Sequence, residues 1–272
     1  MMRSLWTSAS GMNAQMVQID VLTNNLANVN TTGFKRERVE FKSLLYETMQ
    51  RANLDPANMT GRPVNLQVGH GVRPAAVTRT FGQGILQRTD RFADFAIEGH
   101  GFFEIRRGPE EYLFTRDGSF TLMPIDGGLV LATSDGFPVM STDGDVITVP
   151  LDINIETMSI TDTGIFVYID DAGEPADLGY QIRLVQFPNV QGLLAVGSNL
   201  FQETVASGAP LFEVDGEVAI PSRVHNGMLE MSNVQIAEEM VNMITTQRAF
   251  DVNSRGITAS DEMLQTAIQL RR

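Results

Sequence analysis

Apolar side chains recur every seven residues at both ends of this chain, and the pattern between the ends is different. The N-terminal repeat consists of Leu5, Met12, Ile19 and Leu26. The C-terminal repeat consists of Ile236, Met243, Phe250, Ile257 and Leu264, with Met240 widening the same stripe. A seven-residue apolar repeat keeps one helix face turned toward a partner helix. Both ends are therefore predicted to be heptad helices that form a coiled coil.

Local signals set the expected limits of these helices. Ser232 followed by Gln235 matches a capping box, so the C-terminal helix is predicted to begin there and continue to residue 272. Within this span we expect one helix of about 37 residues, which at about 1.5 Å per residue would be about 55 Å long. Near the other end, Asn28, Asn30 and Gly33 form the stop signal expected after a helix.

The apolar stripes need a surface that covers them, because most helical stability in proteins comes from packing. Periodicity alone leaves two interpretations open. In one, two amphipathic helices pack on a single globular core. In the other, the ends form a terminal coiled coil whose remaining apolar surface is covered by further copies of the chain.

The middle of the chain has the texture of β structure. Six short apolar runs alternate with turn residues, and they cover 95–97, 102–105, 112–115, 146–149, 165–169 and 182–187. Asp-Gly pairs, which favour tight turns between strands, fall at regular short intervals among them. The predicted fold class is thus α+β, with a mainly antiparallel β domain inserted between the terminal helices.

Three regions follow from these patterns. Residues 1–33 and 232–272 are predicted to form the helical domain, and 64–231 an all-β outer domain. Residues 34–63 connect them as an extended or hairpin segment, although a loop or a helical extension is also compatible with their sequence.

Charge is distributed unevenly along the chain, whose formal net charge is −13. Residues 108–230 contain 19 acidic and 3 basic residues, whereas the remaining residues contain 14 and 17. Nucleic-acid binding requires basic stripes, so nucleic acid is not an expected partner. No apolar run approaches the length of a membrane span or a secretory signal, so neither membrane insertion nor a cleavable signal peptide is expected.

The side chains that usually carry chemistry do not form a recognisable motif. There is no cysteine, and His70, His100 and His225 are too far apart in sequence to read as a metal motif. The glycine-rich turns lack the spacing of a nucleotide-binding loop. We therefore expect no cofactor, no metal and no catalytic residues. The rival interpretation from another functional class is an extracytoplasmic protein whose acidic β domain binds or cleaves glycans.

Two long segments resemble the signatures of the bacterial flagellar rod and hook proteins. The N-terminal segment runs from Ser10 to Lys35, and its motif residues are Asn24, Asn25, Leu26, Asn28, Gly33, Phe34 and Lys35. The C-terminal segment runs from Ser232 to Asn253. Between them, 96–103 and 112–120 match the start of the family's β domain. The likeness is strongest to distal rod proteins, in which a stretch between the first helix and the β domain is associated with a straight rod. Here that stretch contains Tyr46, Pro56, Gly61, Pro63 and Leu66.

This resemblance implies a structural role. Many copies would assemble helically into a tubular shaft that transmits torque from motor to hook and encloses an export channel. Its partners would be copies of itself, other rod proteins, hook proteins and the surrounding bushing rings. Its location would be the periplasm-spanning basal body, reached by flagellar export. A proximal rod or hook-type subunit is the alternative within the family.

Overall fold

The computed structural model describes residues 2–55, 60–62, 64–109, 111–125, 127–151, 153, 158–169, 175–216 and 218–270. The chain forms two compact units. The first, called the helix–arm unit, contains Met1–Ala27, Glu37–Arg79 and Gln235–Arg272. The second, called the β unit, contains Asn28–Arg36 and Thr80–Val234.

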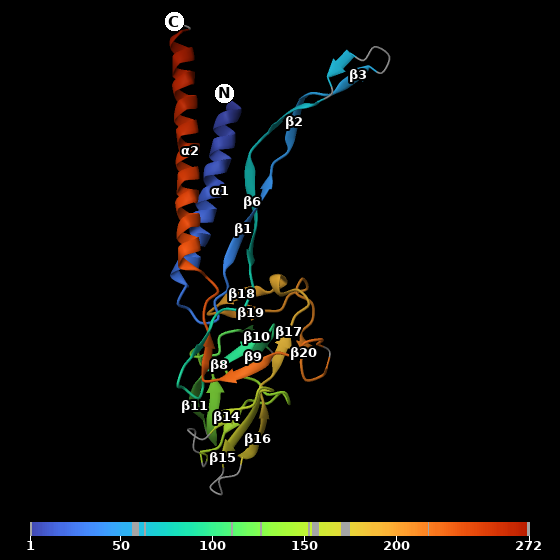
Figure 1. Cartoon of the computed structure of the whole chain (residues 1–272), viewed down its shortest axis with the longest axis vertical. Helices are drawn as coiled ribbons and strands as arrows, with labels where there is room; N and C mark the ends of the chain where they lie inside the picture. Colours follow the sequence, from blue (N-terminus) through green and yellow to red (C-terminus); the bar gives the residue numbers. More distant parts are fainter. Residues whose placement is uncertain are drawn as a thin grey trace. The chain divides into compact units, whose positions relative to one another are not determined.

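Two antiparallel helices form one part of the helix–arm unit. They are α1 (Met2–Ala27) and α2 (Ile236–Gln269), which lie side by side (Figure 1). A two-stranded antiparallel ribbon of residues 37–79, called the arm, forms the other part. Its strand pairs are β1 (Glu37–Ser43) with β6 (Val72–Arg79), β2 (Tyr46–Gln50) with β5 (Leu66–Gly69), and β3 (Asn53–Asp55) with β4 (Thr60–Arg62). The β1–β6 part of the arm packs on α1.

In its described residues, the β unit contains short antiparallel strands and a 3₁₀ turn, η2 (Val190–Gly192). Its largest sheet has the order β18-β19-β10-β9-β17-β20, formed by Leu194–Gly197, Leu200–Gln202, Tyr112–Thr115, Phe102–Arg106, Leu184–Gln186 and Leu211–Phe212. Two three-stranded sheets consist of β11-β12-β13 (Thr121–Ile125, Gly128–Ala132, Thr148–Val149) and β14-β15-β16 (Ser159–Ile160, Ile165–Ile169, Pro175–Gln181). Two pairs complete the unit, β8 (Phe95–Glu98) with β21 (Arg223–Asn226), and β7 (Leu86–Arg88) with β22 (Met228–Glu230).

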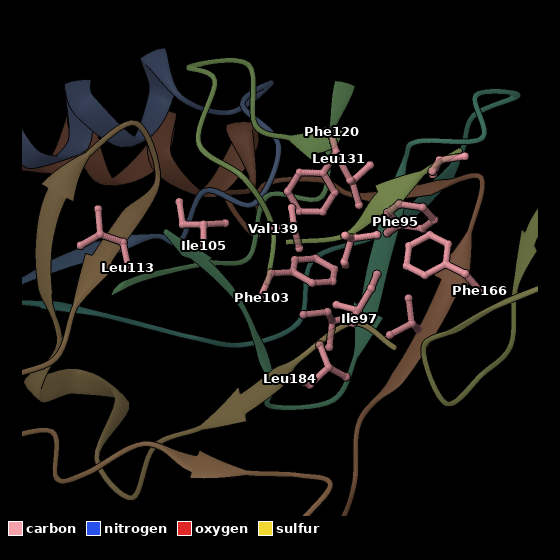
Figure 2. Close-up of a cluster of buried hydrophobic side chains, with 14 of the residues drawn as sticks. Phe95, Ile97, Phe103, Ile105, Leu113, Phe120, Leu131, Val139, Phe166 and Leu184 are labelled. Atoms are coloured by element: carbon pink, nitrogen blue, oxygen red, sulfur yellow. The ribbon is translucent and has the colours of Figure 1, made fainter. Parts of the chain in front are cut away.

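The β unit has a dense apolar core. Figure 2 shows its main cluster, in which side chains from several sheets meet around Phe95, Phe103, Phe120 and Phe166. Phe103 and Phe120 contact edge to face, with ring centroids 5.2 Å apart. A second cluster on the largest sheet gathers Phe102, Phe114, Val185, Phe187, Leu193 and Phe201. Alternating apolar positions on short strands thus close this unit on itself.

The structure confirms the predicted class, with one helix near each end and antiparallel strands between them. Each of the six apolar runs contributes residues to a strand. The segment after Gly33, whose type was ambiguous from sequence, forms strands of the arm.

One predicted boundary is wrong. The C-terminal helix begins at Ile236 rather than at Ser232, and its N-cap residue Gln235 makes no side-chain capping bond. The Ser232 hydroxyl instead accepts a hydrogen bond from the Val234 amide (3.3 Å). Serine can bond the backbone two residues ahead in a turn as readily as it caps a helix, and here the turn is formed. The compact units also divide the chain at points other than residues 33, 63 and 231, since 28–36 join the β unit and 64–79 join the helices.

Candidate functional site: the helix pair and the arm

Small and polar residues make several close contacts between α1 and α2. Ser4 and Ser260 share a hydrogen bond between their hydroxyls (3.1 Å). The Asn25 side-chain amide donates to Glu239 Oε2 (3.4 Å), and both residues are fully buried. Ser8 faces Gly256, and Gly11 faces Asn253, so closely that an added Cβ would lie about 3 Å from the opposing side chain.

These four pairs define one antiparallel register. The two residue numbers of each pair have the same sum, as expected for helices that run in opposite directions. On α1, Ser4, Gly11 and Asn25 are separated by multiples of seven residues. On α2, the same holds for Glu239, Asn253 and Ser260. We call this contact the polar seam. Its glycines and serines let the two backbones approach closely, while its polar pairs tie particular positions together.

The predicted heptad residues are only partly covered in the single chain. Leu5, Met12, Ile19 and Leu26 on α1, and Met243, Phe250, Ile257 and Leu264 on α2, are half-buried. Ile236 and Met240 are about half exposed, at 49% and 51%. Other large apolar side chains of the pair are exposed as well, namely Trp6, Met16, Val241, Ile244, Val252, Met263, Ile268 and Leu270. The helix pair therefore leaves much apolar surface uncovered.

Asn25 also connects the helix pair to the arm. Its side-chain oxygen accepts the Glu37 amide (2.9 Å), and its nitrogen donates to the Glu37 carbonyl (2.8 Å). Asn24 donates to the Glu37 carboxylate (3.2 Å), which also pairs with Arg79 on β6. An asparagine side chain can substitute for backbone in this way because it carries both a donor and an acceptor. The motif residue Asn25 thus fixes the first residue of β1 against α1 and α2.

The arm exposes apolar side chains over most of its length. Leu45, Tyr46, Met49, Val64 and Leu66 are all more than half exposed. Two of the predicted rod-specific residues, Tyr46 and Leu66, are in this group, and Gly61 lies in β4. Pro56 and Pro63 lie outside the described residues. An isolated two-stranded ribbon is marginally stable in water, so this apolar surface needs a covering partner.

The end of the N-terminal motif lies in the β unit. Gly33 has a positive φ of 68°, and its amide donates to the Glu230 carbonyl (2.8 Å). A Cβ at this position would come within 3 Å of the backbone at Arg116 and Asp117. Both the conformation and the space therefore require glycine. Phe34 is half-buried, and Asn28 bonds Thr31 in the preceding turn.

Lys35 belongs to a buried ionic cluster with Glu230 and Arg116. Lys35 Nζ donates to Glu230 Oε1 (2.6 Å) and to the Gly82 carbonyl (2.9 Å). Arg116 Nε donates to Glu230 Oε2 (3.1 Å), and its Nη1 donates to the carbonyls of Gly99 and Gly101. One anion is therefore shared by two cations inside the β unit.

Burial and this two-to-one ratio of charges decide the protonation behaviour. Burial, reinforced by the positive charge of Arg116, lowers the pKa of Lys35 to about 8, against the attraction of Glu230. Burial works against ionisation of Glu230 too. Attraction to Arg116 and Lys35 nevertheless outweighs it, and holds the pKa of Glu230 below its usual value.

The described residues offer little else that resembles a chemical site. Among them, no group of three or more histidine, cysteine, aspartate or glutamate side chains could hold a metal ion. Nor does any described helix have an apolar stretch long enough to cross a bilayer. Sequence reasoning missed the polar seam, although the seven-residue spacing of Ser4, Gly11 and Asn25 was available as a signal.

Comparison with protein-family models gives three matches. Residues 5–35 match the flagella basal body rod protein model, and residues 225–270 match the flagellar basal body rod FlgEFG protein C-terminal model. Residues 96–168 match the flagellar hook protein FlgE/F/G D1 domain. The first two matches include most of the polar seam, and the third lies in the β unit.

Curated proteins of similar sequence extend this likeness over the whole chain. The flagellar basal-body rod protein FlgG of Borreliella burgdorferi is 47% identical over 273 residues, which cover all of both chains. FlgG of Buchnera aphidicola from Schizaphis graminum is 42% identical, covering 99% of this chain and all of the relative. The flagellar hook-basal body complex protein FlhP of Bacillus subtilis is 33% identical over 97% of each chain.

Proposed function

Since this chain belongs to the flagellar basal-body rod proteins of the FlgG family and is a structural subunit of that rod, we propose that it builds the distal part of the rod through helical self-assembly. The helix pair and the arm form its assembly surface. Many copies stack into a tube whose terminal helices surround an axial channel and whose β units form the outer wall.

The observation that carries this proposal is the uncovered apolar surface of the helix–arm unit. Leu5, Met12, Ile19 and Leu26, together with Ile236, Met240, Met243, Phe250, Ile257 and Leu264, supply side chains to neighbouring copies. Because these apolar residues are half-buried or exposed in the single chain, part of their surface remains available to other subunits. Contacts between different surfaces of identical subunits generate open helical filaments rather than closed oligomers.

The assembled shaft carries torque from the motor to the hook, and unfolded export substrates pass through its lumen. Its neighbours are other rod proteins, hook proteins and the bushing rings around it. The subunit itself reaches the periplasm through flagellar export. A chain without cysteine suits such passage, because no disulfide has to form or break on the way.

Residues 46–66 of the arm give the shaft its distal-rod character. They present exposed apolar side chains, among them Tyr46 and Leu66, that stiffen contacts between neighbouring copies. A proximal rod or hook-type role is the alternative. It is less favoured because two FlgG relatives exceed 40% identity over almost the full chain, whereas FlhP is 33% identical.

Charge placed in the apolar stripe tests this proposal. Phe250→Asp is expected to abolish filament formation by the purified protein, because a carboxylate cannot be buried unpaired between subunits. Thr245→Asp, an equal change at an exposed position of α2 outside the heptad, serves as the matched control. Electron microscopy scores filaments, and circular dichroism checks that the β unit remains folded. Normal rods from Phe250→Asp and from Leu26→Asp would refute the proposal.

A further inference from the structure

The arm has one face that is basic rather than apolar. Arg38 and Glu40 lie on either side of the buried Val39 in β1 and point away from it. Lys42 follows them beyond an irregularity of the strand register between Glu40 and Phe41. Lys42 lies directly opposite Arg73 of β6 in the strand register. Arg38, Lys42 and Arg73 are all exposed. We call these three cations, with Glu40 between them, the basic face of the arm.

Two cations directly opposite each other on neighbouring strands repel, and such pairs destabilise a sheet. Among the described side chains, no carboxylate lies within ion-pair distance of Lys42 or Arg73. Two other cations of the same unit are paired, since Arg79 contacts Glu37 and Arg3 contacts Glu47. Among the described residues, the Lys42–Arg73 pair is thus not neutralised, and an anionic partner would relieve its repulsion.

The chain itself contains a suitable anionic surface. The β unit has 23 acidic and 9 basic residues, whereas the helix–arm unit has 10 and 11. The net negative charge of the protein therefore lies in the β unit, which every neighbouring copy would present. We propose that the basic face of the arm, Arg38, Lys42 and Arg73, binds the acidic β unit of a second copy of this chain.

This inference rests on the proposed self-assembly and assigns it a specific contact. Apolar stripes supply most of the association free energy but specify position poorly, because they can slide past one another. Complementary charges steer the encounter and disfavour wrong registers. Since the charges are exposed, salt screens this contact over about 8–10 Å, and assembly is expected to slow as salt is added.

Charge reversal of full-length protein tests the contact. The double variant Lys42→Glu, Arg73→Glu is expected to raise the concentration needed for assembly about tenfold or more and to weaken its salt dependence. The control variant Arg88→Glu, Arg107→Glu changes the net charge equally but lies in the β unit. Because it makes the proposed partner unit more acidic, it should not raise the concentration needed for assembly. If the reversal disturbs folding, the double variant Lys42→Gln, Arg73→Gln removes both positive charges without adding negative ones. It should also raise the concentration needed for assembly.

Cross-linking locates the partner surface directly. The chain has two lysines, and Lys35 is buried with its ammonium bound to Glu230, so Lys42 is the only exposed lysine. A carbodiimide, which joins an amine to a carboxylate in contact with it, is applied to filaments of mixed ¹⁵N-labelled and unlabelled subunits. Mass spectrometry should find Lys42 joined to aspartate or glutamate of residues 80–234 on a different copy.

The outcomes separate this inference from the proposed function. If Phe250→Asp blocks assembly while charge reversal has no effect, the function stands and the basic-face contact is wrong. Cross-links from Lys42 only to carboxylates of the helix–arm unit would also overturn it. Binding of wild-type protein to phosphatidylglycerol vesicles, lost on reversal and with no cross-link between copies, would assign the face to an anionic membrane instead.

Discussion

The two units of this protein handle their apolar side chains in opposite ways. Among the residues that the structure describes, the β unit buries 27 apolar residues and exposes 10 large ones. Of the described apolar residues in the helix–arm unit, Ala14, Val21, Leu22 and Val39 are buried, and 17 large ones are exposed although it is the shorter unit. Apolar burial is the main stabilising term in folding, so the β unit is self-sufficient and the helix–arm unit is not.

The polar seam explains how the two helices of the helix–arm unit can pair within a single chain. A pair of helices joined through their apolar heptads would satisfy itself and leave nothing for neighbours. Here the contact between α1 and α2 also uses hydrogen bonds and close backbone approach, as at Ser4–Ser260 and Gly256, and the heptad residues stay only half-buried. The difference between the units therefore separates a folding core from an assembly surface within one sequence.

The largest effect that tests this comparison is expected in limited proteolysis of the free monomer. Residues 1–30 should be cut rapidly, because their apolar side chains have few partners, while a fragment containing the β unit survives. Assembly into filaments should protect the same residues by about a hundredfold or more. Resistance of residues 1–30 in dilute monomer would mean that the helix pair is stable without neighbours.

A pair of alanine substitutions sharpens the comparison. Phe103→Ala removes a fully buried ring from the β core and should lower the free energy of unfolding by about 3–5 kcal/mol. Phe250→Ala removes a half-buried ring from α2 and should cost the monomer about 1 kcal/mol, but it should impair filament formation. Urea denaturation measures the first quantity, and electron microscopy the second. Equal losses of monomer stability would show that the two units are packed alike.

The sequence predicted the elements well because their signals are local. Seven-residue apolar spacing identified both helices, and the short Val-, Ile- and Phe-rich runs identified strands such as β9 and β15. Gly33 was read as part of a helix stop, and its positive φ in the turn that follows α1 accords with that. Local backbone preferences and side-chain periodicity are enough for statements of this kind.

Long-range polar pairing could not be predicted in the same way. Nothing near Asn25 in the sequence indicates that its amide reaches both Glu37 and Glu239, and Lys35 is separated from Glu230 by almost the whole β unit. Apolar heptads were expected at the centre of the helix contact, because burial favours them there. Sequence cannot tell whether such a stripe faces its own chain or another copy, since either arrangement removes it from water.

The smallest predicted effect concerns the pH dependence that the buried cluster gives the β unit. The pKa of Lys35 falls from its ordinary 10.5 to about 8 in the folded protein. Below pH 8 the Lys35 ammonium is charged in both the folded and the unfolded chain. It therefore does not make the free energy of unfolding depend on pH there. Between about pH 8 and 10.5 the unfolded chain binds more protons than the folded one. The free energy of unfolding should therefore rise with pH in this window, by at most about 3 kcal/mol.

Lys35→Met isolates this contribution, because it keeps the apolar stem and leaves Glu230 bonded to Arg116. The difference in unfolding free energy between wild type and Lys35→Met should move in favour of the wild type as the pH rises from 8 to 10. Urea denaturation at several pH values measures it. Parallel curves for the wild type and Lys35→Met would mean that Lys35 keeps an ordinary pKa. In that case the Lys35–Glu230–Arg116 cluster would be more accessible to water than its position inside the β unit indicates, and the difference in burial between the two units would be smaller.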